Sequence, residues 1–343
     1  MKPSKNGLTF TKKIKEGGLP GMYDVKKIWN PTWFQGNRKQ SGYFEGWYFK
    51  VVSHEGKQSW AFIPGISLSK GDDHSFVQVI NGKTGNSWYY RFPLDAFSYS
   101  KEGFHVQIAN NNFSSKHMTL DLDSDQGRFQ GNFSFSGNHV YRTKLHRPGI
   151  MGWYRYVPFM ECYHGVVSLD HHVEGKLQTG DQMISFSGGK GYIEKDWGSS
   201  MPKAWLWMQS NHFNSHGTSF MLSVARIPWI GNAFTGFLGF FLFQGKRYDF
   251  ATYTGAKLNM KIEESGSVQI SITGKNFHLS VSSQQGKAGS LKAPVSGNMQ
   301  RVIHESIDAT IHIQLVDAKG NTLFTGTGAN AGLELVGDHQ LLL

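Results

Sequence analysis

The chain contains a single cysteine, Cys162, among its 343 residues, so it can form no internal disulfide and no all-cysteine zinc site. Charged residues are also scarce, because Asp, Glu, Lys and Arg together make up 17 %, below the usual ~25 %. Aromatic residues, in contrast, make up 14 %. Since disordered chains carry much charge and few aromatic rings, the composition indicates a folded protein with a large apolar core. The length predicts about two domains.

The sequence also lacks long segments of helical periodicity and long uninterrupted apolar runs. Its most apolar stretch, residues 221–243, is broken by Arg226, Pro228 and several glycines. Because a charge or a proline is costly within a membrane span, we expect a β-hairpin there, with a bulky apolar loop at residues 228–231. The N-terminus is basic and polar, with no apolar segment after it. We therefore expect no secretory signal and a cytoplasmic location.

The net charge is +10 with histidine neutral, which could favour nucleic acid or anionic lipid. Lys and Arg are scattered, however, with the densest group at residues 12–15. No nucleic-acid-binding motif is present, so we expect no nucleic-acid partner. A solvated basic surface explains the charge equally well. Together with the apolar loop around Trp229, the charge motivates the hypothesis of peripheral membrane contact, with an ordinary packed loop as the alternative.

The dominant pattern is the alternation of apolar and polar residues, which is typical of strands with one buried face. It is clearest at residues 131–136 and 307–315. Further predicted strands are residues 46–52, 60–63, 76–80, 88–92, 104–108, 118–122, 220–225, 237–243, 268–272 and 277–281. Turn signals separate them at about 8–12 residues, the rhythm of antiparallel sandwiches and barrels. The sequence thus predicts an all-β fold, with residues 142–163 as a long loop between two β units.

Two longer segments are more specific: YFEGWYFKV at residues 43–51 and YIEKDWGSSMPKAWLWMQSN at residues 192–211. In this order they resemble the tocopherol cyclase family, with a shorter match, LKAP, at residues 291–294. The resemblance implies two tandem lipocalin-like antiparallel β-barrels with few short helices, which we place at residues 22–180 and 181–343. It also implies cofactor-independent ring closure in a prenylated hydroquinone, within a superfamily that includes carotenoid hydratases.

Such ring closure needs an acid that protonates an alkene, exclusion of water from the cation, and a nearby hydroxyl oxygen. A carboxyl group stays protonated near pH 7 only where burial raises its pKa. The carboxyl groups of the two motifs have aromatic or apolar neighbours. We therefore predict Glu45 or Asp196 as the proton donor, with Glu194 and Lys195 adjusting its pKa. The alternative for each is a structural hydrogen-bond network.

Aromatic rings would stabilise the cation through their faces and line an apolar barrel lumen for the prenyl tail. The residues predicted to form this wall are Trp47, Tyr48, Trp197, Trp205 and Trp207. Ordinary core packing is the alternative. Lys195, Glu161 and His164 are also expected beside the substrate, with Glu161 and His164 forming a proton relay near Cys162.

Other chemistries have weaker support. His171 and His172 would point to opposite faces of a strand, so they cannot readily chelate one ion, and we predict neither a metal site nor a cofactor. The predicted activity is a tocopherol cyclase-like, acid-catalysed cyclisation of an isoprenoid lipid. A non-catalytic lipid carrier or sensor and a hydratase or isomerase of linear isoprenoids remain alternatives. The partner in each case is a hydrophobic isoprenoid or prenylated aromatic small molecule.

Overall fold

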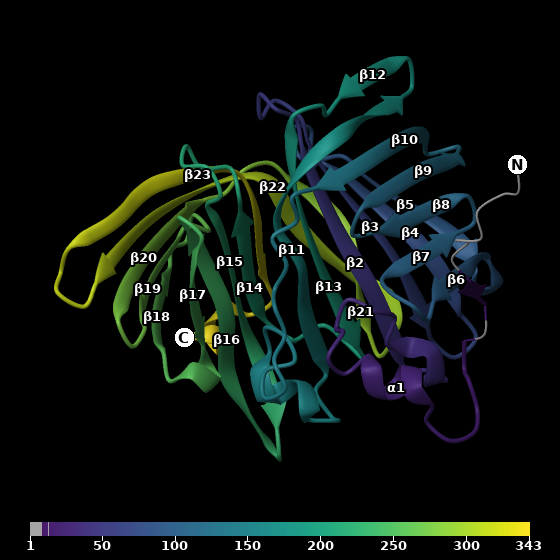
Figure 1. The fold of residues 1–343 in the computed structure, drawn as a ribbon, viewed down its shortest axis with the longest axis horizontal. Helices are drawn as coiled ribbons and strands as arrows, with labels where there is room; N and C mark the ends of the chain where they lie inside the picture. The colour runs from purple at the N-terminus through teal and green to yellow at the C-terminus, as the bar shows by residue number, and fades with distance from the viewer. Residues whose placement is uncertain (1–8, 13) are drawn as a thin grey trace, which may run out of the picture.

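The computed structural model, which describes residues 9–12 and 14–343, consists almost entirely of antiparallel strands in two large sheets (Figure 1). The described helices are one α-helix, α1 (Met22–Lys26), and short 3-10 turns. Within the described residues, no helix is long and apolar enough to cross a membrane. The predicted all-β fold with few short helices is confirmed.

The first sheet runs in the order β1-β6-β7-β8-β9-β10-β11-β13-β2-β3-β4-β5, with β12 paired to β11. Its strands are β1 (Phe10–Thr11), β2 (Tyr43–Val52), β3 (Ser59–Leu68), β4 (His74–Asn81), β5 (Ser87–Pro93), β6 (Phe97–Ser100), β7 (His105–Ile108), β8 (Asn111–Ser114), β9 (His117–Ser124), β10 (Gly127–Ser136), β11 (Cys162–Thr179), β12 (Gln182–Ser185) and β13 (Gly189–Gly198).

The second sheet runs in the order β17-β16-β15-β14-β23-β22-β20-β19-β18, with β21 paired to β22. Its strands are β14 (Trp205–Ser210), β15 (Ser219–Trp229), β16 (Asn232–Phe243), β17 (Lys246–Ala251), β18 (Lys257–Ile262), β19 (Val268–Thr273), β20 (Phe277–Gln284), β21 (Ala288–Val295), β22 (Asn298–Asp317) and β23 (Thr322–Val336). Among the described residues, the strand pairing joins the end strands of neither sheet, so closure into barrels stays a prediction.

The chain passes from the first sheet to the second at residues 199–204, between β13 and β14. This crossing lies later than the division expected at residues 180/181, because β13 pairs with β2 and β11 in the first sheet. The division into separate domains itself stays a prediction.

Each segment predicted as a strand overlaps a strand of the structure. The apolar stretch at residues 221–243 forms the β15–β16 hairpin, with Ile230 and Gly231 at positive φ in its turn, as expected. Residues 142–161 also form a loop, which contains the 3-10 turn η3 (Gly152–Tyr156). The expectation that this loop separates two β units is wrong, because it joins β10 to β11, which pair with each other.

Strand β2 is buried on both faces, because it lies at the centre of the first sheet and beside the second. One face carries Trp47 and Phe49, which pack inside the first sheet against the rings of Phe104 and Phe113. The opposite face carries side chains that reach the second sheet, among them Tyr48. Strand β13 pairs with β2 along its whole length and shares this double burial.

A fully buried ion pair joins β2 and β13 on the face turned away from the second sheet. Lys195 Nζ lies 2.6 Å from Glu45 Oε1, and neither side chain is exposed. Glu45 also accepts hydrogen bonds from the Gln35 backbone N–H at 2.9 and 3.0 Å and from the Tyr43 hydroxyl at 2.5 Å. Burial lowers the pKa of Lys195 to about 8, against the opposing effect of the Glu45 carboxylate.

Lys195 also anchors the segment that precedes β2. Its ammonium group donates to the backbone carbonyls of Pro31 and Trp33, and it lies 4.9 and 4.6 Å from the ring centroids of Trp47 and Trp197. These contacts satisfy the buried charge without any exposed group. The ion pair therefore has a structural position, and Glu45 does not line the cavity described below, so its role as a proton donor stays a prediction.

We predict that Lys195→Met destabilises the protein by about 3–5 kcal/mol, because it leaves the Glu45 carboxylate buried without its cation. Urea unfolding followed by tryptophan fluorescence measures this change. The matched control is Lys176→Met, at an exposed position of β11, which we expect to change stability by less than ~0.5 kcal/mol. Equal stabilities for the two variants would contradict the structural role of the pair.

Candidate active site

The main cavity lies between the two sheets, with residues from both sheets in its wall. Strands β2, β11 and β13 line it on one side, and β14, β15, β16, β22 and β23 on the other. Most of the lining side chains are apolar or aromatic. An apolar cavity is therefore present as predicted, but it lies between the sheets, whereas the sequence suggested the lumen of a barrel.

Period-two alternation decides which residues of the two motifs reach the cavity. Those that line it are Tyr48, Glu194, Asp196, Trp205 and Trp207, together with Glu161 and His164 from outside the motifs. Glu45, Trp47, Lys195 and Trp197 lie on the opposite face of β2 and β13 and do not line this cavity, so their roles beside a substrate stay predictions. The two tryptophans flank the Lys195 ammonium group instead.

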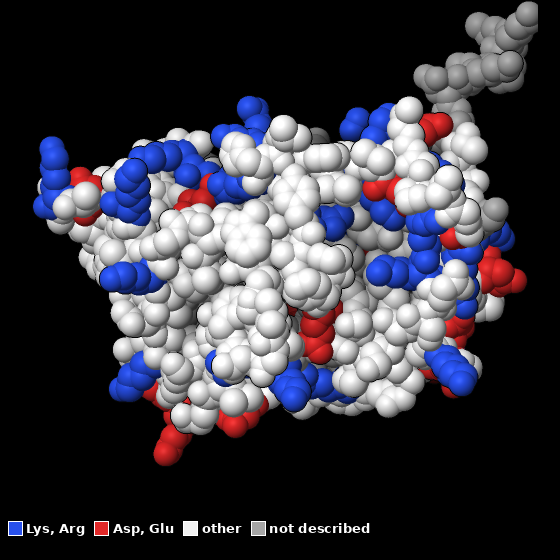
Figure 2. All heavy atoms as spheres, turned by 90° about the horizontal axis from the view of Figure 1, so that it is seen from below, with Lys and Arg blue, Asp and Glu red and all other residues white. Residues whose placement is uncertain are grey.

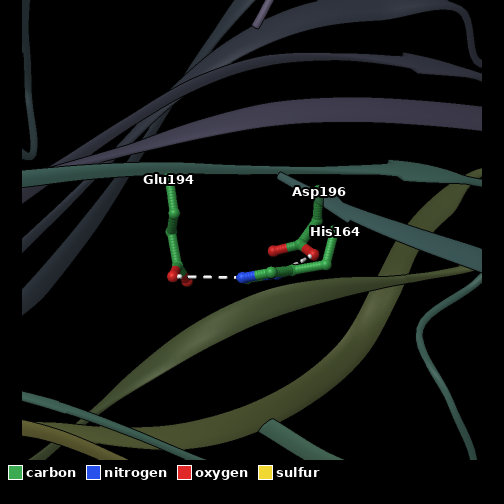
Figure 3. Close-up of side chains that lie close together, drawn as sticks. All are labelled: His164, Glu194 and Asp196. Atoms are coloured by element: carbon green, nitrogen blue, oxygen red, sulfur yellow. Dashed lines mark hydrogen bonds and ion pairs between the residues drawn. The ribbon is translucent and has the colours of Figure 1, made fainter. Parts of the chain in front are cut away.

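Three titratable side chains from β11 and β13 form one cluster in the cavity wall (Figure 3). His164 and Asp196 are directly opposite residues of the two strands, and His164 Nδ1 lies 2.8 Å from Asp196 Oδ1. On its other side, His164 Nε2 lies 3.4 Å from Glu194 Oε2. Burial alone would lower the pKa of His164, but the two carboxylates outweigh it and raise this pKa well above its usual range. The imidazole is therefore positively charged at neutral pH.

Hydrogen bonds from neighbouring aromatic residues hold Glu194 in place. Its Oε2 atom accepts from the Tyr192 hydroxyl at 2.6 Å and from Trp207 Nε1 at 3.2 Å. The Trp207 ring lies against Gly332 of β23, where any Cβ atom would collide with it. The cluster is thus held by contacts from both sheets.

Glu161 lines the same cavity but does not form the predicted relay with His164, whose partners are Asp196 and Glu194. Burial raises the pKa of Glu161, and its Oε2 atom has no hydrogen-bond partner among the described residues. The Cys162 thiol lies 4.0 Å from Asp196 Oδ1, and burial raises its pKa, which leaves it in the unreactive thiol form.

A second carboxyl pair, Glu305 of β22 and Glu334 of β23, also lines the cavity and was not found from the sequence. The two residues are directly opposite one another in the antiparallel pairing. The Tyr48 hydroxyl donates to Glu305 Oε1 at 2.5 Å, and Trp205 Nε1 donates to Glu334 Oε2 at 2.5 Å. Burial and neighbouring carboxylates raise the pKa of Glu305 well above its usual range and that of Glu334 to about 8.

A signal for Glu305 was present in the sequence, because it stands between two apolar residues in the period-two alternation of β22. Ile303 and Ile307 lie on either side of it in that alternation, and all three are buried. A carboxyl group on an apolar face indicates a special environment. Glu334 follows a glycine-rich stretch, and no comparable signal marks it.

The donor atoms of His164, Glu194 and Asp196 lie within 4.8 Å of one another, so among the described residues this cluster could hold a metal ion. One imidazole and two carboxylates are donor types that suit a divalent transition metal. In the structure these atoms face each other as ion-pair and hydrogen-bond partners. The three side chains thus pair with one another within the cavity wall.

Comparison with known proteins places this site in a family. A model of the tocopherol cyclase-like family matches residues 132–337, a range that includes both carboxyl pairs and His164. The chain is 22 % identical over 356 residues to a chloroplastic tocopherol cyclase of Zea mays, which covers 86 % of this chain and 75 % of that protein.

Solved structures share the fold at low sequence identity. CghA has a TM-score of 0.58 and 9 % identity, covering 96 % of each chain. A protein assigned as AttH from Nitrosomonas europaea has a TM-score of 0.51 and 10 % identity, covering 85 % of this chain and 92 % of that chain. These likenesses concern the fold alone. Because the family match spans the greater part of the sequence, the chain belongs to the tocopherol cyclase-like family.

Proposed function

We propose that the protein catalyses the proton-initiated ring closure of a prenylated hydroquinone or a related isoprenoid lipid in the cavity between the sheets. The observation that carries this proposal is the position of His164 between Asp196 and Glu194, in a cavity whose lining is mostly apolar or aromatic. The name of the maize relative, a tocopherol cyclase, supports the substrate class.

The reaction requires two proton transfers, one to the substrate and one from it, so no net proton is consumed. A proton adds to the alkene, the substrate hydroxyl oxygen bonds to the resulting tertiary cation, and the hydroxyl proton leaves to a base. The Asp196 carboxyl group lies 2.8 Å from His164 Nδ1 and lines the cavity, so it is placed to accept this last proton. We therefore propose an acceptor role for Asp196 in place of the donor role expected from the sequence.

The rest of the cavity wall is suited to an apolar substrate and a short-lived cation. The rings of Tyr48, Trp205 and Trp207 line it, and each ring face that meets a cation contributes about 0.5–2 kcal/mol. Burial of a prenyl tail adds about 25 cal/mol per Å² of apolar surface. Removal of water from this wall also prevents capture of the cation by water.

Exposed and half-buried aromatic and apolar side chains continue the cavity lining onto the surface. We call this group the aromatic rim; its members are Trp153, Tyr154, Phe159, Trp229, Ile230 and Phe234. Tyr154 and Phe234 also line the cavity, and the Trp229 ring lies 5.8–6.4 Å from those of its aromatic neighbours. Phe159 and Ile230 are 63 % and 80 % exposed.

We infer that the aromatic rim rests on a lipid surface, so that the substrate enters the cavity without crossing water. Figure 1 places the β15–β16 tip at the lower end of the molecule, and Figure 2 views that end directly. In this view most of the central surface is uncharged apart from a group of Asp or Glu atoms, and Lys and Arg lie toward the margin together with further Asp and Glu. The exposed apolar side chains of the rim and the net charge of +10 suit a membrane that contains anionic lipid.

We predict that Asp196→Asn lowers kcat on a prenyl hydroquinone by about 10²–10⁴-fold, because the amide cannot accept the hydroxyl proton. Product formation is followed by liquid chromatography and mass spectrometry, with folding checked by urea unfolding. Asp181→Asn, at an exposed turn, is the matched control and should keep the wild-type rate. Wild-type turnover by folded Asp196→Asn would exclude the acceptor role.

Product mass separates the proposed function from its alternatives. Ring closure or isomerisation leaves the substrate mass unchanged, and the chromatographic position separates these two products, whereas hydration adds one water molecule. A lipid carrier would retain the isoprenoid in native mass spectrometry and form no product. Tight binding without any product from the wild-type protein would therefore favour the carrier over the enzyme.

We predict that Phe159→Asp together with Ile230→Asp lowers binding to vesicles with anionic lipid by at least about tenfold, because each side chain loses apolar burial. Vesicle flotation at low and high salt measures the binding. The control is Leu323→Asp, an exposed apolar residue at the start of β23, outside the rim. Equal flotation of the rim variant and wild type would contradict the membrane contact.

A further inference from the structure

The carboxyl pair Glu305–Glu334 has no role in the steps described above, yet it lies in the same cavity. Both residues are directly opposite one another on β22 and β23. Like charges at directly opposite positions of an antiparallel pair repel, and burial removes the water that would screen them. The pair therefore holds at least one proton at neutral pH.

The hydrogen bonds of the pair leave one buried oxygen atom without a partner. Tyr48 binds Glu305 through Oε1, and Trp205 binds Glu334 through Oε2. Glu305 is fully buried, and its Oε2 atom has no hydrogen-bond partner among the described residues. An unpaired carboxyl oxygen in an apolar cavity is costly unless it carries a proton or meets a ligand.

Groups from the first sheet surround the pair and influence its charge. On β2 these are Tyr48, bound to Glu305, and the buried Lys50, whose ammonium group donates to Gln209 Oε1 at 2.8 Å. Burial lowers the pKa of Lys50 to about 7, so it neutralises the pair only partly at neutral pH. On β13 and β11, Glu194, Asp196 and His164 also act on Glu334 through their charges.

The two clusters are connected through the cavity wall. Tyr48, which binds Glu305, is the direct cross-strand neighbour of Glu194 on β13. Trp207, which binds Glu194, is the direct cross-strand neighbour of Glu334 on β23. The carboxyl pair and the His164 cluster therefore lie close enough for one small-molecule substrate to meet both.

We propose that protonated Glu305 is the catalytic acid that donates its proton to the substrate alkene, with Glu334 as the positioning residue that keeps that proton in place. This inference rests on the proposed function. The Glu305 O–H bond breaks as a C–H bond forms, the cation forms a C–O bond with the substrate hydroxyl, and Asp196 takes the hydroxyl proton. Asp196 then releases a proton to solvent as Glu305 regains one, so none is consumed.

The same arrangement specifies the chemical class of ligand. Five carboxyl groups, Glu161, Glu194, Asp196, Glu305 and Glu334, line one cavity, with His164 and Lys292 as its basic residues. An anionic head group would meet repulsion there, whereas a neutral lipid with a hydroxyl group would find both donors and acceptors. We therefore expect selection of neutral, hydroxyl-bearing isoprenoids against fatty acids.

Deuterium incorporation distinguishes the proposed proton donor, Glu305, from the proposed proton acceptor, Asp196. With a prenyl hydroquinone in D₂O, the wild-type enzyme should place one deuterium at the protonated alkene carbon of the cyclised product. Glu305→Gln should lower the rate of this deuterium incorporation by at least 10²-fold. Asp196→Asn should still exchange or isomerise the alkene with deuterium uptake while it loses ring closure. Wild-type incorporation by folded Glu305→Gln would overturn the assignment.

Infrared spectroscopy tests the protonated pair without any activity. At pH 7 the wild-type protein should show a protonated-carboxyl C=O band that disappears in the Glu305→Gln, Glu334→Gln double variant and persists in the exposed control Glu264→Gln. Turnover should decline at alkaline pH as the pair loses its proton, and Glu334→Gln should move that limb. A double variant that keeps the band overturns the inference alone. A band present with no wild-type turnover on any prenyl hydroquinone overturns the proposed function, and the inference with it.

Discussion

The alternation of strand β13 is the constraint on which the rest of the molecule depends. This one strand sends Lys195 and Trp197 into the first sheet and Glu194 and Asp196 toward the second. Glu194 and Lys195 are buried and the Asp196 side chain is only 25 % exposed, so each of these charged groups needs a partner. On one face the partner is Glu45, in a pair with no exposed side chain. On the other face it is His164, which remains open to the cavity.

Acidic and basic side chains have different roles on the two faces of strand β13. The Glu45–Lys195 pair is surrounded by backbone donors and acceptors and ring faces, which leaves no free site for a ligand. The cavity face carries more carboxyl groups than cations, so its charge is balanced partly by retained protons. A surplus of buried carboxyl groups is what an acid catalyst near neutral pH requires.

The cavity between the sheets depends on both sheets of this chain. The first sheet provides Tyr48 and the His164 cluster. The second sheet provides Trp205 and Trp207 and the carboxyl pair Glu305–Glu334. Neither sheet alone contains the complete set. The loop of residues 137–161 and the β15–β16 tip then extend the apolar lining to the surface, through rings that contact one another.

The amino-acid sequence by itself determined the strands, the hairpin at residues 221–243 and the family, because period-two alternation, turns and motifs are local properties. It also determined that Glu194 and Asp196 share one face and Glu45 and Trp47 another. Only the tertiary structure decided which face meets the cavity, because β2 and β13 are buried on both sides and alternation does not distinguish two buried faces. The contacts of Tyr48 with Glu305 and of His164 with Asp196 join residues far apart in the chain, so they depend on strand pairing and sheet packing.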